Sequence, residues 1–166
     1  MPKRRRRVSI RKLHELFRYE ESDGRLYRRI RSGNAAAGTA TGHRDSWGAV
    51  QVSVKGRLYL AHRVIWAMKT GKWPRKTIDH RDRNPENNRW GNLREATRAQ
   101  QTANKIHTKG NSSSRGLHWR GERQAWQVML AGKHLGQFRD KSEAMRVFDD
   151  AAKKRWGEFY PGGVNQ

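Results

Sequence analysis

The segment from Thr77 to Asn104, "TIDHRDRNPENNRWGNLREATRAQQTAN", places the strongest constraint on how this chain folds. It is rich in asparagine, it also holds Asp79, Asp82 and His80, and it has very little apolar material with which to bury itself. Carboxylate and amide oxygens are the ligands that hard cations such as Mg²⁺ prefer, and a nearby histidine is suited to act as a general base. The segment therefore predicts a polar site rather than an ordinary loop.

The pattern within this segment indicates a strand, a loop and a helix. "KTID" before His80 is typical of a short strand, "RDRNPENNRWG" of a polar loop, and "NLREATRAQQTANK" of a helix that starts near Asn92. This order would bring Asp79 and His80, at the end of the strand, over against side chains of the helix. Hydrolysis of a phosphodiester needs a general base and an oxygen-ligated cation, and the segment supplies both.

The charge of the chain indicates its partner. Thirty-seven Lys and Arg against fifteen Asp and Glu give a net charge of +22, and so many like charges repel one another unless a polyanion neutralises them. Nucleic acid is the expected partner, and the charge permits DNA and RNA equally. The basic excess is concentrated before residue 77, so the first half should supply most of the attraction to phosphate.

Composition excludes several other classes. The chain has no Cys, which rules out disulfides, Cys-based zinc fingers and a thiol nucleophile, and which suits a reducing compartment. No apolar run approaches the length of a membrane-spanning helix, and "MPKRRRRVSIRK" lacks the apolar core of a secretory signal. We expect a soluble intracellular protein.

Short elements are predicted in the first half of the chain. The block "KRRRRV" is either a disordered tail or an arm that contacts phosphate, and Ser9 caps a short helix after it. An Asp-Gly turn precedes the strand in "SDGRLYRRI", and apolar alternation on both sides of Lys55 and Gly56 predicts a hairpin. "VIWAMKTGKWP" predicts a brief helix that Gly71 and the following proline end.

After a Gly- and Ser-rich linker, the C-terminal part predicts three strands and one helix. "GLHWRG", "QAWQVMLAG" and "KHLGQFRD" are short runs with turns between them, and "KSEAMRVFDDAAKKRWG" is an amphipathic helix. Ser142 is the expected cap of this helix and Gly157 its end. One helix packed on a three-stranded sheet is the simplest assembly. The alternation leaves open whether Trp126 lies in the core or contacts DNA. The helix face is expected to hold Ala144, Val147, Phe148, Ala151 and Ala152.

Two resemblances follow from these residues. "AHRVIWAMKTGKWPRKTIDHRDRNPENNRWGNLREATRAQQTAN" resembles the HNH endonuclease family in its phage-type branch, and "SSSRGLHWRGERQAWQVMLAGKHLGQFRDKSEAMRVFDDAAKKRWGEFY" is similar to the AP2 DNA-binding domain. Together they imply an α+β fold: a ββα-metal HNH module plus an AP2-like three-stranded antiparallel sheet packed on one helix. The expected parts are a basic arm with a short helix (1–20), an HNH nuclease domain (21–106), a linker (107–113) and an AP2-like domain (114–166).

The HNH resemblance implies roles for individual residues. His80 would be the general base that activates water, and Asp79 a ligand of one divalent cation, Mg²⁺ or Mn²⁺, in each active site. Asn92, the family's middle residue, would hold the loop through its backbone and so aim His80. The helix residue nine positions later, often Asn or His in the family, is Gln101 here, and Asn104 one turn further on is the other candidate ligand.

The AP2 resemblance implies that one face of the sheet lies in the major groove of DNA, where Arg reads guanine. Arg89, in the HNH module, is a further candidate for DNA binding. The candidates in the AP2-like module are Arg115, Trp119, Arg120, Arg123, Trp126, Gln127 and His134.

Several residues keep two interpretations. Asn88 is a candidate phosphate ligand. Arg89 either binds phosphate or pairs with a carboxylate of the loop. A buried hydrogen-bonding role is expected for His62 and Arg63, in preference to metal ligation. Arg94 contacts either DNA or a neighbour on its helix.

The function that the resemblances imply is a metal-dependent DNA endonuclease of homing or phage type. It would nick one strand of double-stranded DNA as a monomer or weak dimer in the cytoplasm, that of the host cell if phage-encoded, without a membrane. The alternative is a catalytically weak or inactive DNA-binding protein on an HNH scaffold, which Gln101 favours. An RNA-binding protein is a third possibility.

Overall fold

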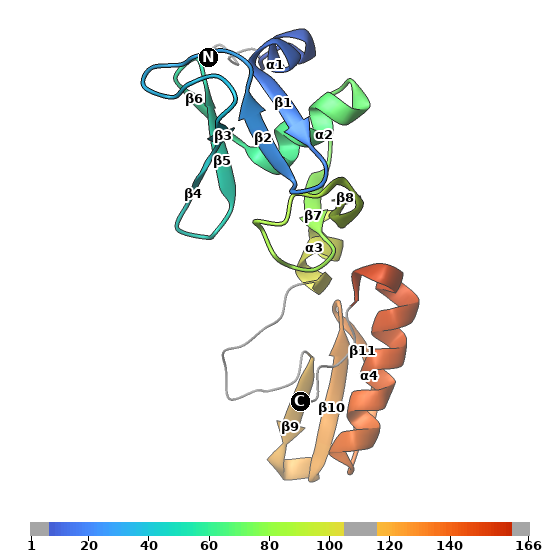
Figure 1. The fold of residues 1–166 in the computed structure, drawn as a ribbon. Coiled ribbons are helices and arrows are strands. Elements are labelled where there is room, and N and C mark those ends of the chain that lie inside the picture. Colours follow the sequence, from blue (N-terminus) through green and yellow to red (C-terminus); the bar gives the residue numbers. More distant parts are fainter. Residues whose placement is uncertain (1–6, 105–115, 161–166) are drawn as a thin grey trace, which may run out of the picture. The chain divides into compact units, whose positions relative to one another are not determined.

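The computed structural model describes residues 7–104 and 116–160, which belong to two compact units, Met1–Thr97 and Arg98–Gln166 (Figure 1). The expected linker, Arg115 and residues 3–6 of the basic block lie outside the described residues. Each unit has a hydrophobic core of its own.

Within its described residues, the first unit combines two α-helices with three small antiparallel sheets. The sheets are ordered β1-β2-β3, β4-β5-β6 and β7-β8. In chain order the elements are α1 (Ile10–Leu16), β1 (Phe17–Glu20), β2 (Arg25–Arg28), β3 (Ala40–Thr41), β4 (His43–Arg44), β5 (Val50–Val54), β6 (Arg57–Leu60), α2 (Ala61–Thr70), β7 (Thr77–His80), the 3₁₀ turn η1 (Trp90–Asn92) and β8 (Leu93–Ala96).

Caps and turns begin and end these elements largely where the sequence predicts. The Ser9 hydroxyl accepts a hydrogen bond from the Lys12 amide at 3.3 Å, which confirms the cap of α1. Lys55 and Gly56 both have positive φ, at 49° and 72°, as the tight turn between β5 and β6 requires. Gly71 takes the left-handed conformation that ends α2.

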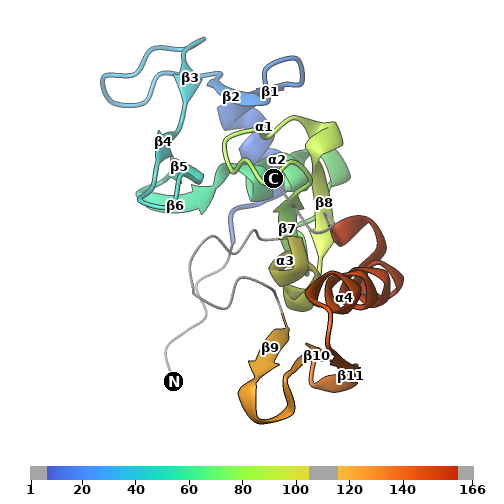
Figure 2. The ribbon, with the colours of Figure 1, turned by 90° about the horizontal axis from the view of Figure 1, so that it is seen from below.

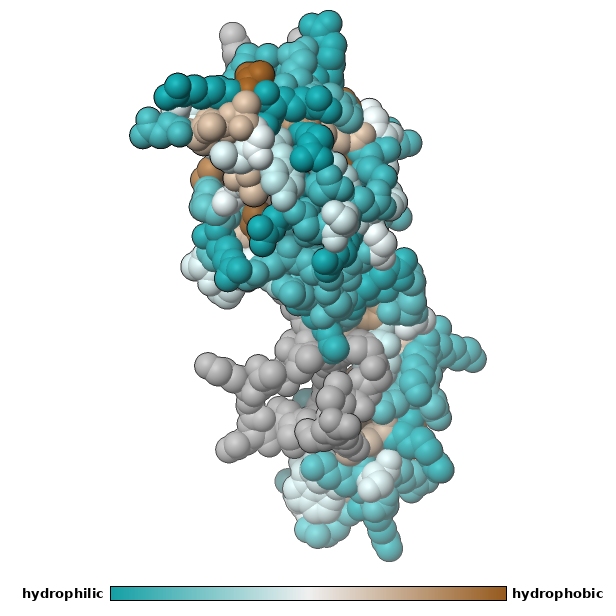
Figure 3. Space-filling model, viewed as in Figure 1, coloured by the Kyte–Doolittle hydropathy of each residue, from teal (hydrophilic) through white to brown (hydrophobic). Residues whose placement is uncertain are grey.

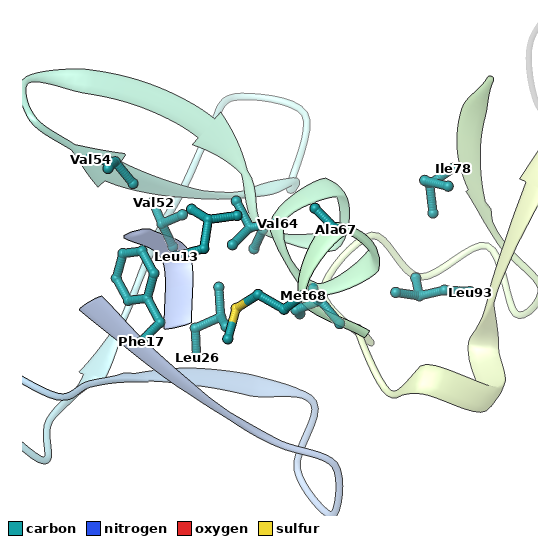
Figure 4. Close-up of a cluster of buried hydrophobic side chains, with 12 residues drawn as sticks. Leu13, Phe17, Leu26, Val52, Val54, Val64, Ala67, Met68, Ile78 and Leu93 are labelled. Carbon is teal, nitrogen blue, oxygen red and sulfur yellow. The ribbon is translucent and has the colours of Figure 1, made fainter. Parts of the chain in front are cut away.

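The core of the first unit joins the helices to the strands (Figure 4). Leu13 of α1 and Val64 of α2 are completely buried, and Ile78 and Leu93 extend the same cluster to β7 and β8. The site-bearing hairpin is therefore anchored by apolar side chains, each of which stabilises the folded state by roughly 1.5–3 kcal/mol when fully buried. The buried members are Leu13, Phe17, Leu26, Val52, Val54, Ala61, Val64, Ile65, Ala67, Met68, Ile78 and Leu93.

The helix predicted from Asn92 onward is wrong over its first part. Residues Leu93–Ala96 form β8, which pairs antiparallel with β7, and helix α3 (Arg98–Asn104) begins only after Thr97. "LREA" consists of good helix formers, but pairing satisfies the backbone of β7 and places neighbouring side chains on opposite faces, where both Leu93 and Arg94 are buried. Tertiary packing overrides local helix propensity here.

The second unit carries a three-stranded antiparallel sheet with one long helix on one of its faces (Figure 2). This confirms the predicted number of strands, and Phe148 and Ala152 of the helix are buried against the sheet, as expected. Its likeness to an AP2 domain stays a prediction. After α3 the elements are β9 (Leu117–Arg120), the 3₁₀ turn η2 (Gly121–Arg123), β10 (Ala125–Leu130), β11 (Lys133–Phe138), α4 (Lys141–Trp156) and the 3₁₀ turn η3 (Gly157–Phe159).

Two details of α4 differ from expectation. Its cap is Asp140, whose carboxylate accepts a hydrogen bond from the Glu143 amide at 2.7 Å, while Ser142 lies inside the first turn. Asp140 has extended backbone angles, as a capping residue must, so the helix starts two residues earlier than a Ser142 cap would allow. Val147 is only partly buried, because the buried face centres on Ala144 and Phe148.

The surface is polar. The face of the first unit visible in Figure 3 is mostly hydrophilic, and the large apolar side chains that are exposed among the described residues are Ile30, Trp47, Leu58 and Trp119. In the part of the chain that the structure covers, every helix is too short or too polar to cross a membrane.

Candidate functional site

Asp79 lies on β7 directly opposite Arg94 on β8. Its Oδ2 atom accepts a hydrogen bond from Nε of Arg94 at 3.0 Å and forms an ion pair with Nη2 at 3.0 Å, and the two side chains are only 7% and 6% exposed. The sequence left open whether Arg94 contacts DNA or a helix neighbour, and the structure instead buries it against the carboxylate. The hydrogen bond fixes the orientation of the Asp79 carboxylate. The pair is also costly to break, because removing either partner would leave a buried charge uncompensated.

His80 ends β7, and its Nε2 atom lies 2.9 Å from Oδ1 of Asn88. An amide oxygen accepts but does not donate, so Nε2 carries the proton in this contact and Nδ1 is the nitrogen that can accept one. Asn88 is 2% exposed. Its side chain was considered a phosphate ligand, but the structure turns it towards the imidazole. The signal that would have found this contact is a loop long enough to fold back on the strand end.

Asn92 ties the loop after His80 together. Its Nδ2 group donates to Oδ1 of Asp82 at 2.8 Å and to the carbonyl of Asn87 at 2.7 Å, while its Oδ1 accepts from the Asp82 amide. Burial raises the pKa of Asp82, but hydrogen bonds from the Asn84 amide, Asn87 and Asn92 outweigh it and leave that pKa below its ordinary value. The geometry agrees with the expected loop-holding role of Asn92, whose effect on catalysis stays a prediction.

The turn between β1 and β2 holds the same loop from outside. Arg89 donates from Nε to the carbonyl of Ser22 at 2.8 Å, and the Tyr19 hydroxyl donates to the carbonyl of Asn88 at 3.0 Å. Burial raises the pKa of Tyr19 to about 12. Gly24, at φ +73°, approaches the backbone of this loop so closely that an added Cβ would lie 2.6 Å from the backbone nitrogen of Arg89. Arg89 therefore has a structural partner, a backbone carbonyl in place of the loop carboxylate that one of its two interpretations named.

The adjacent His62 and Arg63 on α2 have different surroundings. Arg63 donates to the carbonyls of Pro74 and Lys76 at 3.0 and 3.1 Å and so confirms the expected hydrogen-bonding role. His62 packs edge to face on His80, with ring centroids 5.1 Å apart, and within the described residues its Nδ1 atom has no hydrogen-bond partner. Burial lowers the pKa of His62 to about 3, with smaller contributions from the charges of His80 and Arg63, so the ring is neutral at pH 7.

A divalent cation fits the chemistry of these donors. Across residues 7–104 and 116–160, no cluster of three His, Cys, Asp or Glu forms a complete protein cage for a metal. Mg²⁺ needs no such cage, because it commonly binds through one or two carboxylates and takes its other ligands from water and phosphate. Asp79 supplies a carboxylate, and the buried Nδ1 of His62 is an unpartnered polar atom next to His80.

The two other predicted ligands lie on α3, the first helix of the second unit. Gln101 is half-buried and Asn104 is 4% exposed. Their roles as metal ligands stay predictions.

The strand register divides the predicted DNA-contacting residues of the second unit between the faces of its sheet. Trp119 lies opposite Trp126 and their rings are 5.2 Å apart, next to the pair formed by the buried residues Leu117 and Val128. Trp126 also packs against the hydrophobic core, so its core role has support in the structure. Neither observation tests contact with DNA.

Polar candidates share the other face. Arg120 donates from Nε to Oε1 of Gln127 at 2.7 Å, and Gln137, which the sequence did not single out, lies opposite Gln127 on β11. Arg123 reaches Gln137 at 3.4 Å, and His134 is exposed on the same strand. Gln137 directly precedes the apolar Phe138 on β11, and the alternation of a strand would have indicated that Gln137 lies on the polar face. These side chains form a polar face, and their contact with DNA stays a prediction.

Comparison with known families places one segment of the chain. Residues 59–103, from β6 to α3, match the family model described as HNH endonuclease. No curated protein and no solved structure matches the chain. The segment that holds Asp79, His80 and Asn92 is thus similar to HNH endonucleases, which supports a nuclease.

Proposed function

We propose that this chain is a divalent-metal-dependent endonuclease of homing or phage type that cuts one strand of duplex DNA. The observation that carries the proposal is the pair Asp79 and His80 at the end of β7, with His80 Nε2 held by Asn88 at 2.9 Å. The similarity of residues 59–103 to HNH endonucleases supports it independently. The polar sheet face of the second unit would contribute DNA recognition.

His80 is the general base in this proposal. Because Nε2–H donates to Asn88, Nδ1 takes the proton from the attacking water, and the imidazolium that forms keeps its hydrogen bond to the amide oxygen. Asn92 holds the loop that carries Asn88, through its bonds to Asp82 and to the carbonyl of Asn87. Asn92 thus holds the loop in place, the loop positions Asn88, and Asn88 orients His80.

Asp79 would hold the cation. A bound divalent cation supplies charge neutralisation at the scissile phosphate. Arg94 fixes the direction of the Asp79 carboxylate from the opposite strand. One site of this kind serves one strand, so a monomer nicks duplex DNA.

A DNA-binding protein on an inactive HNH scaffold is the second candidate. Two observations favour it: Gln101 stands where the resemblance leads us to expect Asn or His, and Oδ2 of Asp79 already accepts a hydrogen bond from Arg94 Nε and pairs with its Nη2. Such a protein would neither bind a cation at Asp79 nor cut.

Conversion of supercoiled plasmid to the nicked form tests the two candidates. We expect the wild-type protein to nick with Mg²⁺ or Mn²⁺ and not with EDTA, and His80→Ala to be slower by about 10²–10⁴-fold because the general base is lost. Gln101→Asn, assayed in parallel, measures whether the longer amide limits activity.

The matched control is His14→Ala, since His14 is an exposed histidine in the same unit. It should nick at the wild-type rate. The nuclease proposal fails if neither wild type nor Gln101→Asn cuts with either metal while both still bind DNA, and a calorimetric titration that detects no cation binding would then support the inactive scaffold.

A further inference from the structure

Trp47 is the most exposed large apolar side chain among the described residues, at 87%. It lies between β4 and β5, at residues 45–49, and contributes nothing to either hydrophobic core. Keeping an indole in water forgoes the stabilisation that burial would provide, so its position needs an explanation.

The turn that presents Trp47 is firmly built. The Oδ1 atom of Asp45 accepts hydrogen bonds from the amides of Trp47 and Ala49, both at 2.9 Å, and its Oδ2 accepts from Gln51 at 2.8 Å. The carbonyl of Asp45 also accepts from the Gly48 amide at 3.0 Å. The indole is therefore carried on an ordered support, and little backbone freedom would be lost when it binds a ligand.

The same turn lies against the loop that holds Asn88 and Asn92. Arg44 forms an ion pair with Glu86 at 2.6 Å, and a Cβ added to Gly48 would lie 3.3 Å from Cγ of Pro85. Trp47 is thus carried on a turn that contacts the loop following His80, within one unit.

Charged side chains of both signs lie on the turn that carries Trp47 and on the adjoining loop, where Asp45, Asp82 and Glu86 stand beside arginines. His43 and Arg44 precede it on β4, and Arg81 and Arg83 are exposed on the adjoining loop. The carboxylates nearby are engaged, Asp45 by the turn and Glu86 by Arg44. The attraction to a phosphate backbone comes from the chain as a whole, with its net charge of +22, and the projecting aromatic side chain is complementary to a base face.

We propose that Trp47 is a base-contacting wedge, which stacks on or enters between base pairs of duplex DNA beside the strand to be cut. The inference rests on the DNA-binding part of the proposed function and adds a specific contact to it. Apolar wedges of this kind unstack a base step and bend the duplex, which exposes the backbone at that step. Unstacking costs less where a base is missing, so the wedge gives preference for a duplex with an abasic site.

The test is binding in EDTA, so that no cleavage is required, to two labelled duplexes that differ by one central abasic site. We expect wild type to bind the abasic duplex several-fold more tightly than the intact one. Trp47→Ala should lose this preference, and its affinity for the abasic duplex should fall by about tenfold or more. Trp47→Phe should keep most of the preference and most of the affinity. Leu58→Ala, which removes another exposed apolar side chain from the same unit, should behave as wild type.

Unchanged affinity and preference in Trp47→Ala would overturn the inference. So would a wild-type protein that dimerises on gel filtration through Trp47 while the Ala variant, now monomeric, binds DNA equally well. Failure of the plasmid assay together with a loss of abasic preference in Trp47→Ala would reject the nuclease and leave the wedge standing.

Discussion

At the scale of single residues, the side chains that surround His80 decide its orientation. Asn88 fixes the proton on Nε2, and the neutral His62 covers the ring from α2. Arg94 orients the Asp79 carboxylate through a hydrogen bond, as Asn88 orients the His80 ring. None of these three was assigned its position by the sequence, because each lies far from its partner along the chain or was expected on a different element.

Asn88 offers a test of orientation as distinct from folding. Asn88→Ala removes the acceptor of His80 Nε2, and we expect nicking to slow by about 10- to 100-fold, as for groups that orient histidines at metal sites. Asn88→Asp restores an acceptor and adds a negative charge, which favours the protonated imidazole. The pH at which activity rises should therefore move upward in Asn88→Asp, as measured by rates across a pH series.

Asn84→Ala is the control, since this asparagine belongs to the same loop and its Oδ1 accepts a hydrogen bond from the Glu86 amide. It should keep the wild-type pH profile. An unshifted profile in Asn88→Asp would mean that Asn88 merely stabilises the loop.

At the scale of elements, strand and helix boundaries follow capping and pairing more than composition. The hairpin at Lys55 and Gly56 and the end of α2 at Gly71 needed only local chemistry, and both were predicted. Strand β8 was missed because its helix-forming residues are held extended by pairing with β7. Local patterns predict an element well when its stabilising contacts are themselves local.

The cap of α4 is a measurable case. Asp140→Ala should lower the free energy of unfolding of the second unit by about 1 kcal/mol, because the Glu143 amide loses its acceptor. Ser142→Ala should change it far less, since Ser142 is exposed within the first turn. Urea denaturation followed by circular dichroism compares the two variants, and equal losses would mean that Asp140 is not the operative cap.

At the scale of the whole molecule, the net charge of +22 dominates the interaction with nucleic acid. Each phosphate that a basic side chain neutralises adds about −0.9 to the slope of log affinity against log salt concentration for duplex DNA. We expect nonspecific affinity to fall on the order of 10³-fold or more between about 50 and 200 mM salt, as measured by fluorescence anisotropy.

Structured RNA provides the comparison at a fixed salt concentration. Duplex DNA should compete for the protein at least as well as the RNA does. Clear preference for RNA would favour the RNA-binding interpretation that the charge alone permits.

From the sequence alone we could predict a nucleic-acid partner through the charge, the cap of α1 and the hairpin turn through their local chemistry, and a candidate site through Asp79, His80 and the Asn-rich loop. These properties depend on the residues themselves or on neighbours a few positions away. The tertiary structure alone decided the Asp79–Arg94 pair, the contact of Asn88 with His80, and the place of Trp47 against the loop. Those depend on strand pairing and on packing between distant segments, whose energies no local pattern contains.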